Sequence, residues 1–438
     1  MTLKARPEWK PAGKATLRAV LAVSCLPIAS TLVANATGSR SPRSPALEEA
    51  PRATQSDWPQ FRGPNRDGIS SETGFLESWP EDGPEVIWRV PLGEGFSGIS
   101  VAGGRLYTMY GRDRIEYVAC LDADSGEEIW RFRSDGLYLD PQGNGPRSTP
   151  VIDGGLIFAL GARGKLHAID ADTGHLVWGR DLKADYGASG PTWGYATVPL
   201  VENDLLLVDV GGRSGSSIVA FNKADGKEKW RSQNDLPGYA APIAITVDAV
   251  RQAVFFTGRS VVSLAPETGK MYWKIPWRTS YDVNAAAPVF VPPDKLFVSS
   301  GYDTGAALLH IETSGEKVTV EDVWRSRVMK NQFSSSVYFD GYIYGFDNSI
   351  LKCIEADTGE MMWRARGFGH GSLFYADGNL MVLGTHGTLA LIEATPRSYV
   401  ERAKASVLNG RTWTVPTLVD GRLYLRNETE MIALDLTG

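Results

Sequence analysis

Apolar stretches separated by glycine-containing turns recur along most of this chain, and three of them lead into nearly the same phrase. The phrase reads "DADSGEEIW" at Asp122–Trp130, "DADTGHLVW" at Asp170–Trp178 and "EADTGEMMW" at Glu355–Trp363. Asp, then Thr or Ser, then Gly predict a tight turn there, because Gly takes a positive φ without steric cost. The Trp falls four residues after the Gly, on the strand that follows.

A second kind of turn precedes each of these glycines by about twenty residues. It reads Gly103-Gly104 in the first unit, Asp153-Gly154 in the second and Asp340-Gly341 in a later one, and the series continues with Asp377-Gly378 and Asp420-Gly421. An Asp-Gly pair between apolar runs is a strong hairpin signal. Each unit therefore predicts four strands, with an Asp-Gly turn after the first and a Thr-Gly turn before the fourth, which carries the Trp.

The spacing of the units predicts a propeller. The turn glycines are separated by 48, 52, 43, 46 and 44 residues, and they are Gly126, Gly174, Gly226, Gly269, Gly315 and Gly359. Four-stranded units of about 40–50 residues are typical of propeller blades. A fifth unit is stretched, a seventh ("GSLFYADGNLMVLGTHGTLALIEATP") lacks the Trp, and an eighth ends at its Thr-Gly without a fourth strand.

A lone strand near the N-terminus can supply the missing one. "EVIWRV", Glu85–Val90, has a Trp and no strand of a blade before it. If this strand completes the eighth blade, the ring closes and leaves no open sheet edge between the first and last blades. We therefore expect an all-β fold over residues 57–438, an eight-bladed β-propeller of four-stranded antiparallel blades, in which each Trp fills the gap to the next blade.

The first 56 residues predict export. Basic residues precede the uncharged stretch "AVLAVSCLPIASTLVANA", and Ala34-Asn35-Ala36 resembles a cleavage site. We expect a signal peptide over residues 1–36, a disordered linker rich in Ser, Pro and Arg over residues 37–56, and a periplasmic or extracellular protein. Pro27 argues against a permanent membrane helix. "LAVSC", which ends at Cys25, is a poor match to a lipoprotein box, so a lipid anchor at Cys25 is less expected than cleavage.

Composition excludes several other classes of function. The net charge is −6 and no run of Lys or Arg follows the signal, so a nucleic-acid partner is not expected. Cys120 and Cys353 take the same phase as Ala168 and Ala220 in other units, which predicts two buried free thiols rather than a disulfide. The five histidines have no metal-ligand spacing, so no metal is expected. We expect a monomer.

Two short motifs have structural explanations. "DADTG" has the D-x-D-x-G spacing of a calcium loop, but no Glu follows at the distance where a bidentate ligand would be needed, which favours an Asx turn. "GEGFSG", Gly93–Gly98, matches a dinucleotide fingerprint by letters, but it leads into a strand rather than a helix. Neither motif therefore predicts a cofactor.

The chemistry is concentrated in the loops that join the Trp strand of one blade to the first strand of the next. All of these loops must lie on one face of the ring, which predicts a binding mouth. Loop capping and packing are the better explanation for any single residue, but the set spans seven blades. It comprises Arg147, Trp193, Tyr195, Tyr239, Asp282, Asn284, Lys330, Asn331, Gln332, Arg366, His370, Arg411 and Trp413.

Three features resemble the pyrroloquinoline-quinone (PQQ) repeat family of eight-bladed propellers: "DWPQFRGPNRDGIS" before the first blade, the D-x-T-G-x-x-x-W corners, and "PTWGYATVPLV". The resemblance covers residues 57–438. It implies the fold more firmly than an activity, because the family includes quinoprotein alcohol dehydrogenases and also the non-enzymatic, BamB-like propeller subunit of the outer-membrane barrel assembly machine.

Resemblance to the dehydrogenases implies that the Trp193 ring would lie under the quinone as its floor. Asp282 would then be the base, and Asn284 would be an amide ligand of calcium. Arg147 or Lys330 would hold the PQQ carboxylates. The adjacent Cys-Cys pair of many dehydrogenases is absent, and Asp185 is the one acidic candidate in the loops between the second and third blades.

These departures favour an exported binding or scaffold protein, with an unknown ligand or partner and no cofactor, over an enzyme. A PQQ- and calcium-dependent alcohol dehydrogenase is the first alternative. The second is a sugar or peptide binder that uses Trp193 and Trp413 as stacking platforms.

Overall fold

The computed structural model describes residues 57–315 and 317–437. The predicted signal peptide, linker and Cys25 lie outside the described residues. Within them the chain is almost entirely β, with one short helix, α1 (Leu182–Tyr186), and one 3-10 turn, η1 (Ser280–Asp282). None of the helices described is long and apolar enough to cross a membrane.

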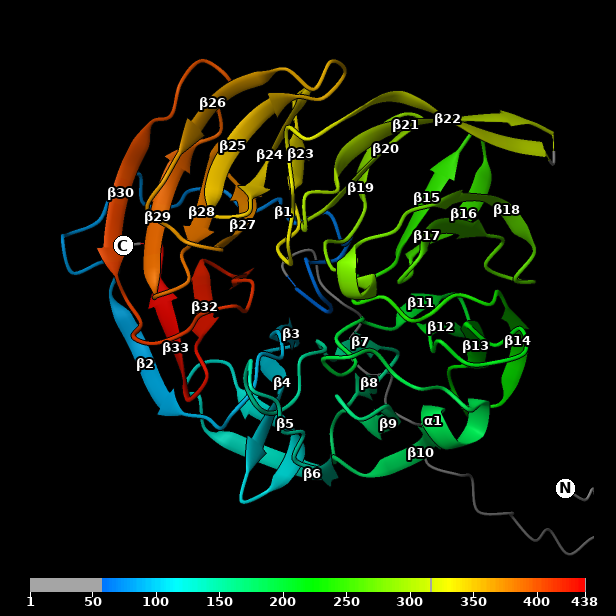
Figure 1. The fold of residues 1–438 in the computed structure, drawn as a ribbon. Coiled ribbons are helices and arrows are strands. Elements are labelled where there is room, and N and C mark those ends of the chain that lie inside the picture. Colours follow the sequence, from blue (N-terminus) through cyan, green and yellow to red (C-terminus); the bar gives the residue numbers. More distant parts are fainter. Residues whose placement is uncertain (1–56, 316, 438) are drawn as a thin grey trace, which may run out of the picture. The chain divides into compact units, whose positions relative to one another are not determined.

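Eight antiparallel sheets form the blades, which surround one axis with the first strand of each blade toward the centre (Figure 1). Blades 1 to 4 consist in turn of β3 (Ser100–Ala102), β4 (Arg105–Arg112), β5 (Ile115–Asp122) and β6 (Glu128–Gly136); β7 (Val151–Asp153), β8 (Leu156–Leu160), β9 (Lys165–Asp170) and β10 (Leu176–Asp181); β11 (Leu200–Glu202), β12 (Leu205–Asp209), β13 (Ile218–Asn222) and β14 (Glu228–Ser232); and β15 (Ile243–Val247), β16 (Val250–Phe256), β17 (Ser260–Leu264) and β18 (Met271–Pro276).

Blades 5 to 8 follow the same order. They consist of β19 (Val289–Val291), β20 (Lys295–Ser300), β21 (Gly305–Ser314) and β22 (Lys317–Ser326); β23 (Val337–Phe339), β24 (Tyr342–Asp347), β25 (Ile350–Glu355) and β26 (Met361–Ala365); β27 (Ser372–Ala376), β28 (Asn379–Leu383), β29 (Thr388–Glu393) and β30 (Glu401–Ser406); and β31 (Thr417–Val419), β32 (Arg422–Arg426) and β33 (Glu430–Asp435), completed by β2 (Val86–Pro91).

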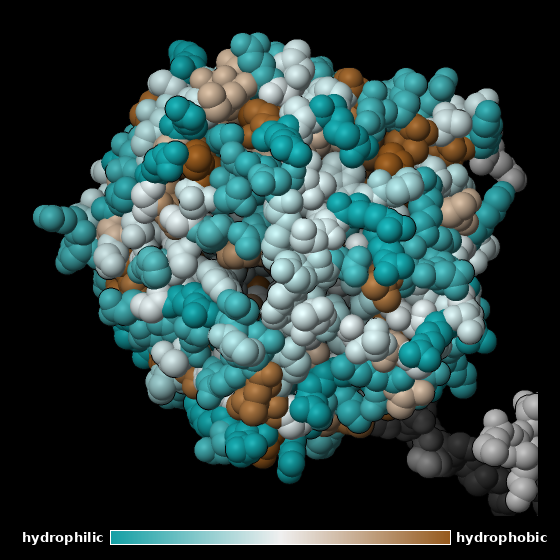
Figure 2. Space-filling view, in the orientation of Figure 1, coloured by the Kyte–Doolittle hydropathy of each residue, from teal (hydrophilic) through white to brown (hydrophobic). Residues whose placement is uncertain are grey.

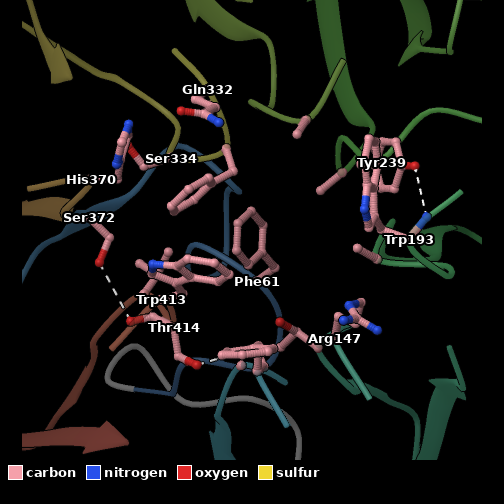
Figure 3. Close-up of a pocket in the computed structure, with 18 of the residues that line it drawn as sticks. Phe61, Arg147, Trp193, Tyr239, Gln332, Ser334, His370, Ser372, Trp413 and Thr414 are labelled. Carbon is pink, nitrogen blue, oxygen red and sulfur yellow. Dashed lines mark hydrogen bonds between the residues drawn. The ribbon is translucent and has the colours of Figure 1, made fainter. Parts of the chain in front are cut away.

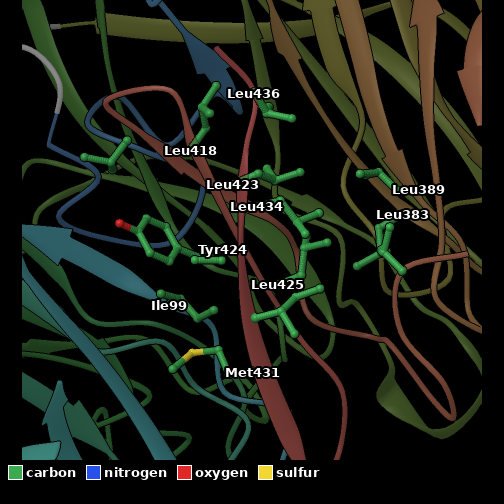
Figure 4. Packing of buried hydrophobic residues seen from close by; sticks show 14 of the residues in the cluster. Ile99, Leu383, Leu389, Leu418, Leu423, Tyr424, Leu425, Met431, Leu434 and Leu436 are labelled. Carbon is green, nitrogen blue, oxygen red and sulfur yellow. The ribbon is translucent and has the colours of Figure 1, made fainter. Parts of the chain in front are cut away.

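The predicted ring closure is confirmed. Strand β2 pairs antiparallel with β33 and places Trp88 opposite Ala433. A buried apolar cluster continues across the closure and joins Leu383 of blade 7, Leu434 of blade 8 and Ile99, which precedes blade 1 (Figure 4). A further short strand, β1 (Ile69–Ser70), adds in parallel to the inner edge of blade 7.

The repeated phrase forms the contact between neighbouring blades. The indole N–H of Trp130 donates to the carbonyl oxygen of Ala171 in the next blade at 3.1 Å, and Trp178 donates to Lys223 at 2.9 Å. A Cβ placed on Gly174 would lie 2.7 Å from the Trp130 ring. The corner therefore needs Gly both for its positive φ and for the close approach of the preceding Trp.

Blade 4 departs from this arrangement. Its Trp273 donates to the side-chain oxygen of Gln252 in the same blade, at 2.9 Å, rather than to the next corner. The corner of the stretched fifth unit lies between β21 and β22, which are 10 residues each, and no atom lies within 4 Å of where a Cβ on Gly315 would be, so Trp273 does not pack against this corner. Val318 of this long hairpin packs in the same buried cluster as Trp273.

The turns largely follow the prediction. Asp340 and Gly341 both have positive φ, 47° and 85°, as a two-residue hairpin turn requires. In blade 2 the turn lies one residue later than predicted, at Gly154 and Gly155, because Asp153 still pairs with Leu156. The Asp of the repeated phrase forms an Asx turn, as expected: Asp122 Oδ1 accepts the backbone N–H of Ser125 at 2.8 Å.

The two predicted thiols are confirmed as buried and free. Cys120 lies opposite Trp130 and Cys353 opposite Trp363, so both occupy the same place in their blades. Burial raises the pKa of the Cys120 thiol to about 11 and that of Cys353 to about 12. Both cysteines therefore act as small packing residues.

Candidate ligand-binding mouth

The loops that enter the first strand of each blade meet around a cavity of about 440 Å³ near the axis, which we call the mouth. Every one of these eight loops contributes a lining residue. The lining consists of Phe61, Phe96, Gly98, Gln142, Arg147, Thr149, Trp193, Ala196, Val198, Tyr239, Ala241, Val283, Ala285, Tyr302, Gln332, Phe333, Ser334, His370, Ser372, Trp413, Thr414 and Val415. One face of the ring, mostly hydrophilic, is hollowed near its centre (Figure 2).

Aromatic rings line two sides of the mouth (Figure 3). On one side, the ring of Trp413 lies 5.2 Å from Phe96 and 5.1 Å from Phe333, centroid to centroid. On the other side, Trp193 lies 6.2 Å from Tyr239, whose hydroxyl oxygen accepts the backbone N–H of Trp193 at 3.2 Å. The hydrogen bond and the ring contacts hold these side chains in place before any ligand arrives.

The segment before the first blade contributes Phe61, which lies between the two aromatic sides (Figure 3). Two buried arginines anchor this segment to the ring. Arg62 donates to the carbonyl oxygen of Ser336 in the loop before blade 6, and Arg66 donates to Pro242, before blade 4, at 3.0 Å. The segment therefore fixes Phe61 by bonds to several blades.

Two basic side chains line the mouth. Arg147 donates to the carbonyl oxygens of Gly143 at 2.6 Å and Gly145 at 3.3 Å, and its guanidinium carbon lies 4.7 Å from the centroid of Tyr138. Burial lowers the pKa of Arg147 and that of His370. None of the described residues that line the mouth is an Asp or a Glu. The mouth is therefore aromatic, with a cation and without a counter-charge of its own.

The sequence-predicted residues divide into three groups. Arg147, Trp193, His370 and Trp413 line the mouth, together with Tyr239 and Gln332. Tyr195, Asn284 and Asn331 are buried behind it and hold the loops, as the capping explanation predicted. For example, Asn284 Nδ2 donates to the carbonyl oxygen of Thr257 at 2.8 Å, and Asn331 Nδ2 donates to that of Phe346 at 2.9 Å.

The third group lies outside the lining. The carboxylate of Asp282 is 3.6 Å from Arg259, and Lys330 pairs with Asp303 at 3.4 Å and Asp347 at 3.7 Å. Arg366 is exposed. Arg411 lies over the Trp413 ring, with its guanidinium carbon 4.5 Å from the centroid, and is itself outside the lining.

Sequence reasoning missed four aromatic residues of the mouth: Phe61, Phe96, Phe333, and Tyr302, which lies between β20 and β21 rather than in a loop that enters a blade. Phe96 could have been found, because its loop enters blade 1 as the other candidate loops enter theirs. Phe333 follows the candidates Asn331 and Gln332 directly. Phe61 lies in a segment outside the repeat, so the repeat pattern carried no signal for it.

The residues present do not fit PQQ held by calcium. Calcium needs six to eight oxygen ligands, and these usually include carboxylates. The described lining of the mouth contains no carboxylate. Among residues 57–315 and 317–437, no group of three or more His, Cys, Asp and Glu side chains could hold a metal. Asp185 lies in α1 and Asp282 beside Arg259, both outside the lining.

Known proteins match this chain in sequence. The family model described as outer membrane protein assembly factor BamB matches residues 114–363 and 347–438. A protein of that name from Burkholderia pseudomallei (strain K96243) is 26% identical over 337 residues, covering 63% of this chain and 83% of that protein. A quinohemoprotein alcohol dehydrogenase, ADH-IIG, from Pseudomonas putida is 25% identical over 295 residues, covering 58% of this chain and 38% of that protein.

Solved structures share the fold. BamB from Moraxella catarrhalis has a TM-score of 0.59 at 15% identity, covering 80% of this chain and 99% of that one. The quinohemoprotein alcohol dehydrogenase from Comamonas testosteroni has a TM-score of 0.61 at 13% identity, covering 88% of this chain and 81% of that one. With the repeats, the corners and the ring closure, the family match allows one conclusion: the chain belongs to the PQQ-repeat family of eight-bladed propellers described as outer membrane protein assembly factor BamB.

Proposed function

We propose that the protein is an exported, non-enzymatic binding propeller that holds an extended segment of a partner protein in its mouth. The observation that carries the proposal is the wall itself: loops of several blades and the segment before blade 1 bring aromatic rings together around one cavity, whose described lining has no carboxylate. Aromatic side chains dominate the energetic centres of protein interfaces, and a catalytic site for alcohol oxidation would need a base and a metal-bound quinone.

Exposed aromatic residues at the rim support a macromolecular partner. Tyr281 is 70% exposed, and its ring contacts Trp193 at 5.9 Å and Tyr302 at 6.1 Å, centroid to centroid. The aromatic surface therefore extends from the cavity to the outside. A chain segment could place one side chain in the mouth while the next contacts the rim, and a small molecule would leave the rim unused.

The relatives support a place in the cell envelope. Several are named outer membrane protein assembly factors. The start of this chain, basic residues followed by an uncharged apolar stretch, also predicts export. Assembly factors act by contacting other proteins, so the names also favour a protein partner over a reaction.

A peptide selection tests the proposal. A random peptide library should yield sequences that bind the wild-type protein with Trp fluorescence changes. The Trp193→Ala/Tyr302→Ala double variant should not bind these peptides, because it removes two of the rings that line the mouth. Met362→Ala, an exposed apolar side chain on the outer strand β26, is the matched control and should still bind them.

Three results would contradict the proposal. Selected peptides that bind the double variant as well as the wild type would place the partner site elsewhere. A carbohydrate that displaced every peptide would favour the sugar-binding alternative. Alcohol-dependent dye reduction by the protein loaded with PQQ and calcium would favour the dehydrogenase.

A further inference from the structure

We infer that the mouth recognises a carboxylate carried next to an aromatic ring, as at the C-terminal residue of a polypeptide or in a small aromatic acid. The inference rests on the proposed function, that the mouth is the binding site, and it specifies the ligand. Three features of the mouth carry it: a guanidinium without an acidic partner, a wall of rings, and the size of the cavity.

The guanidinium of Arg147 is prepared for an anion. Among the described residues, no carboxylate lies within 4.0 Å of its nitrogens, and its hydrogen bonds go to backbone oxygens of its own loop. Those two bonds leave three of its five N–H donors for a ligand, which suits the two oxygens of one carboxylate. The Tyr138 ring at 4.7 Å and the Phe96 ring at 6.0 Å hold the guanidinium in position.

Nearby acidic groups do not cancel this charge. Glu116 and Asp140 act on Arg147 over longer distances, and burial of Arg147 outweighs them. Glu116 is buried, which raises its pKa to about 7, and its Oε1 accepts the backbone N–H of Tyr138 at 3.1 Å. Near neutral pH Glu116 therefore carries only part of a negative charge, and Arg147 keeps its capacity to bind an anion.

The second basic residue of the mouth carries little charge at neutral pH, which favours a monoanion over a more highly charged ligand. His370 lies on the opposite side of the mouth from Arg147 (Figure 3). Burial lowers the pKa of its imidazole. At neutral pH the ring can therefore donate or accept a hydrogen bond, but it contributes no full charge. Among the described lining residues Arg147 carries the one permanent charge, and Arg411, beside the lining, is paired with Glu428 at 3.9 Å. One such charge matches one carboxylate, whereas a phosphate dianion would need more compensation.

The rest of the ligand follows from the wall. A cavity of about 440 Å³ lies toward the lower end of the range of about 300–1,000 Å³ for ligand pockets, so it can take one or two residues but no folded element. Phe61, Trp413 and Trp193 surround this space with apolar ring faces and edges. A planar ring bonded close to the carboxylate fills such a space better than an aliphatic chain.

Synthetic ligands test the inference. Four probes are titrated into the purified protein: an N-acetylated hexapeptide that ends in Phe with a free carboxylate, the same peptide amidated, the same peptide ending in Ala, and phenylpropionate. The free Phe acid should bind about 10- to 100-fold more tightly than the amide, which is the range for a charged hydrogen-bonded contact. The Ala acid should also bind more weakly, because it leaves the ring space empty.

Variants of Arg147 separate charge from fold. Arg147→Met keeps the aliphatic stem and should bind acid and amide equally weakly, and Arg147→Lys should recover part of the preference. Arg366→Met, an exposed arginine in the loop before blade 7, is the matched control and should behave as the wild type. Thermal melts of all variants check the fold.

The outcomes distinguish the inference from the proposed function. Peptides that bind the mouth without regard to amidation or Arg147 would overturn the carboxylate inference and leave the proposed function standing. Binding of phenylpropionate alone, lost in Arg147→Met, would support the inference with a small acid as the ligand and overturn the protein partner. Binding of none of the probes would overturn the inference.

Discussion

The ring of Trp88 packs against Gly126, so that a Cβ added at Gly126 would lie 2.9 Å from the indole. Trp88 belongs to the strand that closes the ring and Gly126 to the corner of blade 1. The Trp88 indole N–H also donates to the carbonyl oxygen of Ala123 at 3.0 Å. The joint between the first and last blades is therefore built like the other Trp corners, although the other three strands of the last blade come from the C-terminal end of the chain.

We expect Gly126→Ala to destabilise the protein by about 2–4 kcal/mol, since the new methyl group must both adopt a positive φ and displace the Trp88 ring. Gly104→Ala separates the two effects. Gly104 has nearly the same φ, 71° against 73°, but no atom would lie within 4 Å of its Cβ. It should cost only about 1 kcal/mol. Denaturant melts of the two variants measure the difference, and equal losses would show that the Trp contact contributes nothing.

The segment before blade 1 should contribute strongly to stability. Arg66 is buried and donates to the side-chain oxygen of Gln60 at 2.7 Å, to Pro242 at 3.0 Å, and to Pro199. Arg66→Ala leaves these acceptors without the donor and should cost about 2–5 kcal/mol. Arg364→Ala, an exposed arginine on β26, should change the free energy of unfolding by less than about 0.5 kcal/mol. A small loss in both variants would mean that the segment is not anchored through Arg66.

The corners and the ring could be predicted because each blade repeats one local solution, a Gly followed by a Trp at fixed spacing. The side-chain directions in the mouth loops could not. Asp282 follows Tyr281, and both have positive φ, 56° and 64°, in a turn that sets the carboxylate beside Arg259. Nothing in "SYDVN" specifies that turn. Likewise, Phe61 is anchored by Arg62 and Arg66. These arginines bind the ring through backbone carbonyl oxygens that lie more than a hundred residues away in the sequence.

Asp209 should make the protein less stable as the pH rises. Its side chain is buried, burial raises its pKa to about 8, and its Oδ2 accepts the backbone N–H of Gly238 at 2.9 Å. The folded state then holds a proton that the unfolded state, with a pKa of about 3.9, releases. The stability contributed by this group is present at low pH and is lost progressively between about pH 4 and pH 8.

The variant Asp209→Asn should therefore melt higher than the wild type, with a larger gain at pH 8 than at pH 5. The amide keeps an acceptor for Gly238 and carries no charge. Asp282→Asn is the control, because Asp282 is part exposed and pairs with Arg259 in an ion pair worth at most about 1 kcal/mol. A gain that did not change with pH would show that Asp209 is already ionised in the folded protein.

Calcium should add nothing to any change in melting temperature that PQQ alone produces. A ligand that binds only the folded state must stabilise it, by about 2.7 kcal/mol when it is present at a hundred times its dissociation constant. The mouth offers aromatic rings and Arg147 but no carboxylate to hold calcium, so PQQ with calcium should stabilise no more than PQQ alone. Asp282→Asn should then leave every binding measurement unaltered, because its carboxylate faces Arg259 outside the lining. A rise in melting temperature that requires calcium and disappears in Asp282→Asn would instead make Asp282 part of the site and return the protein to the dehydrogenases.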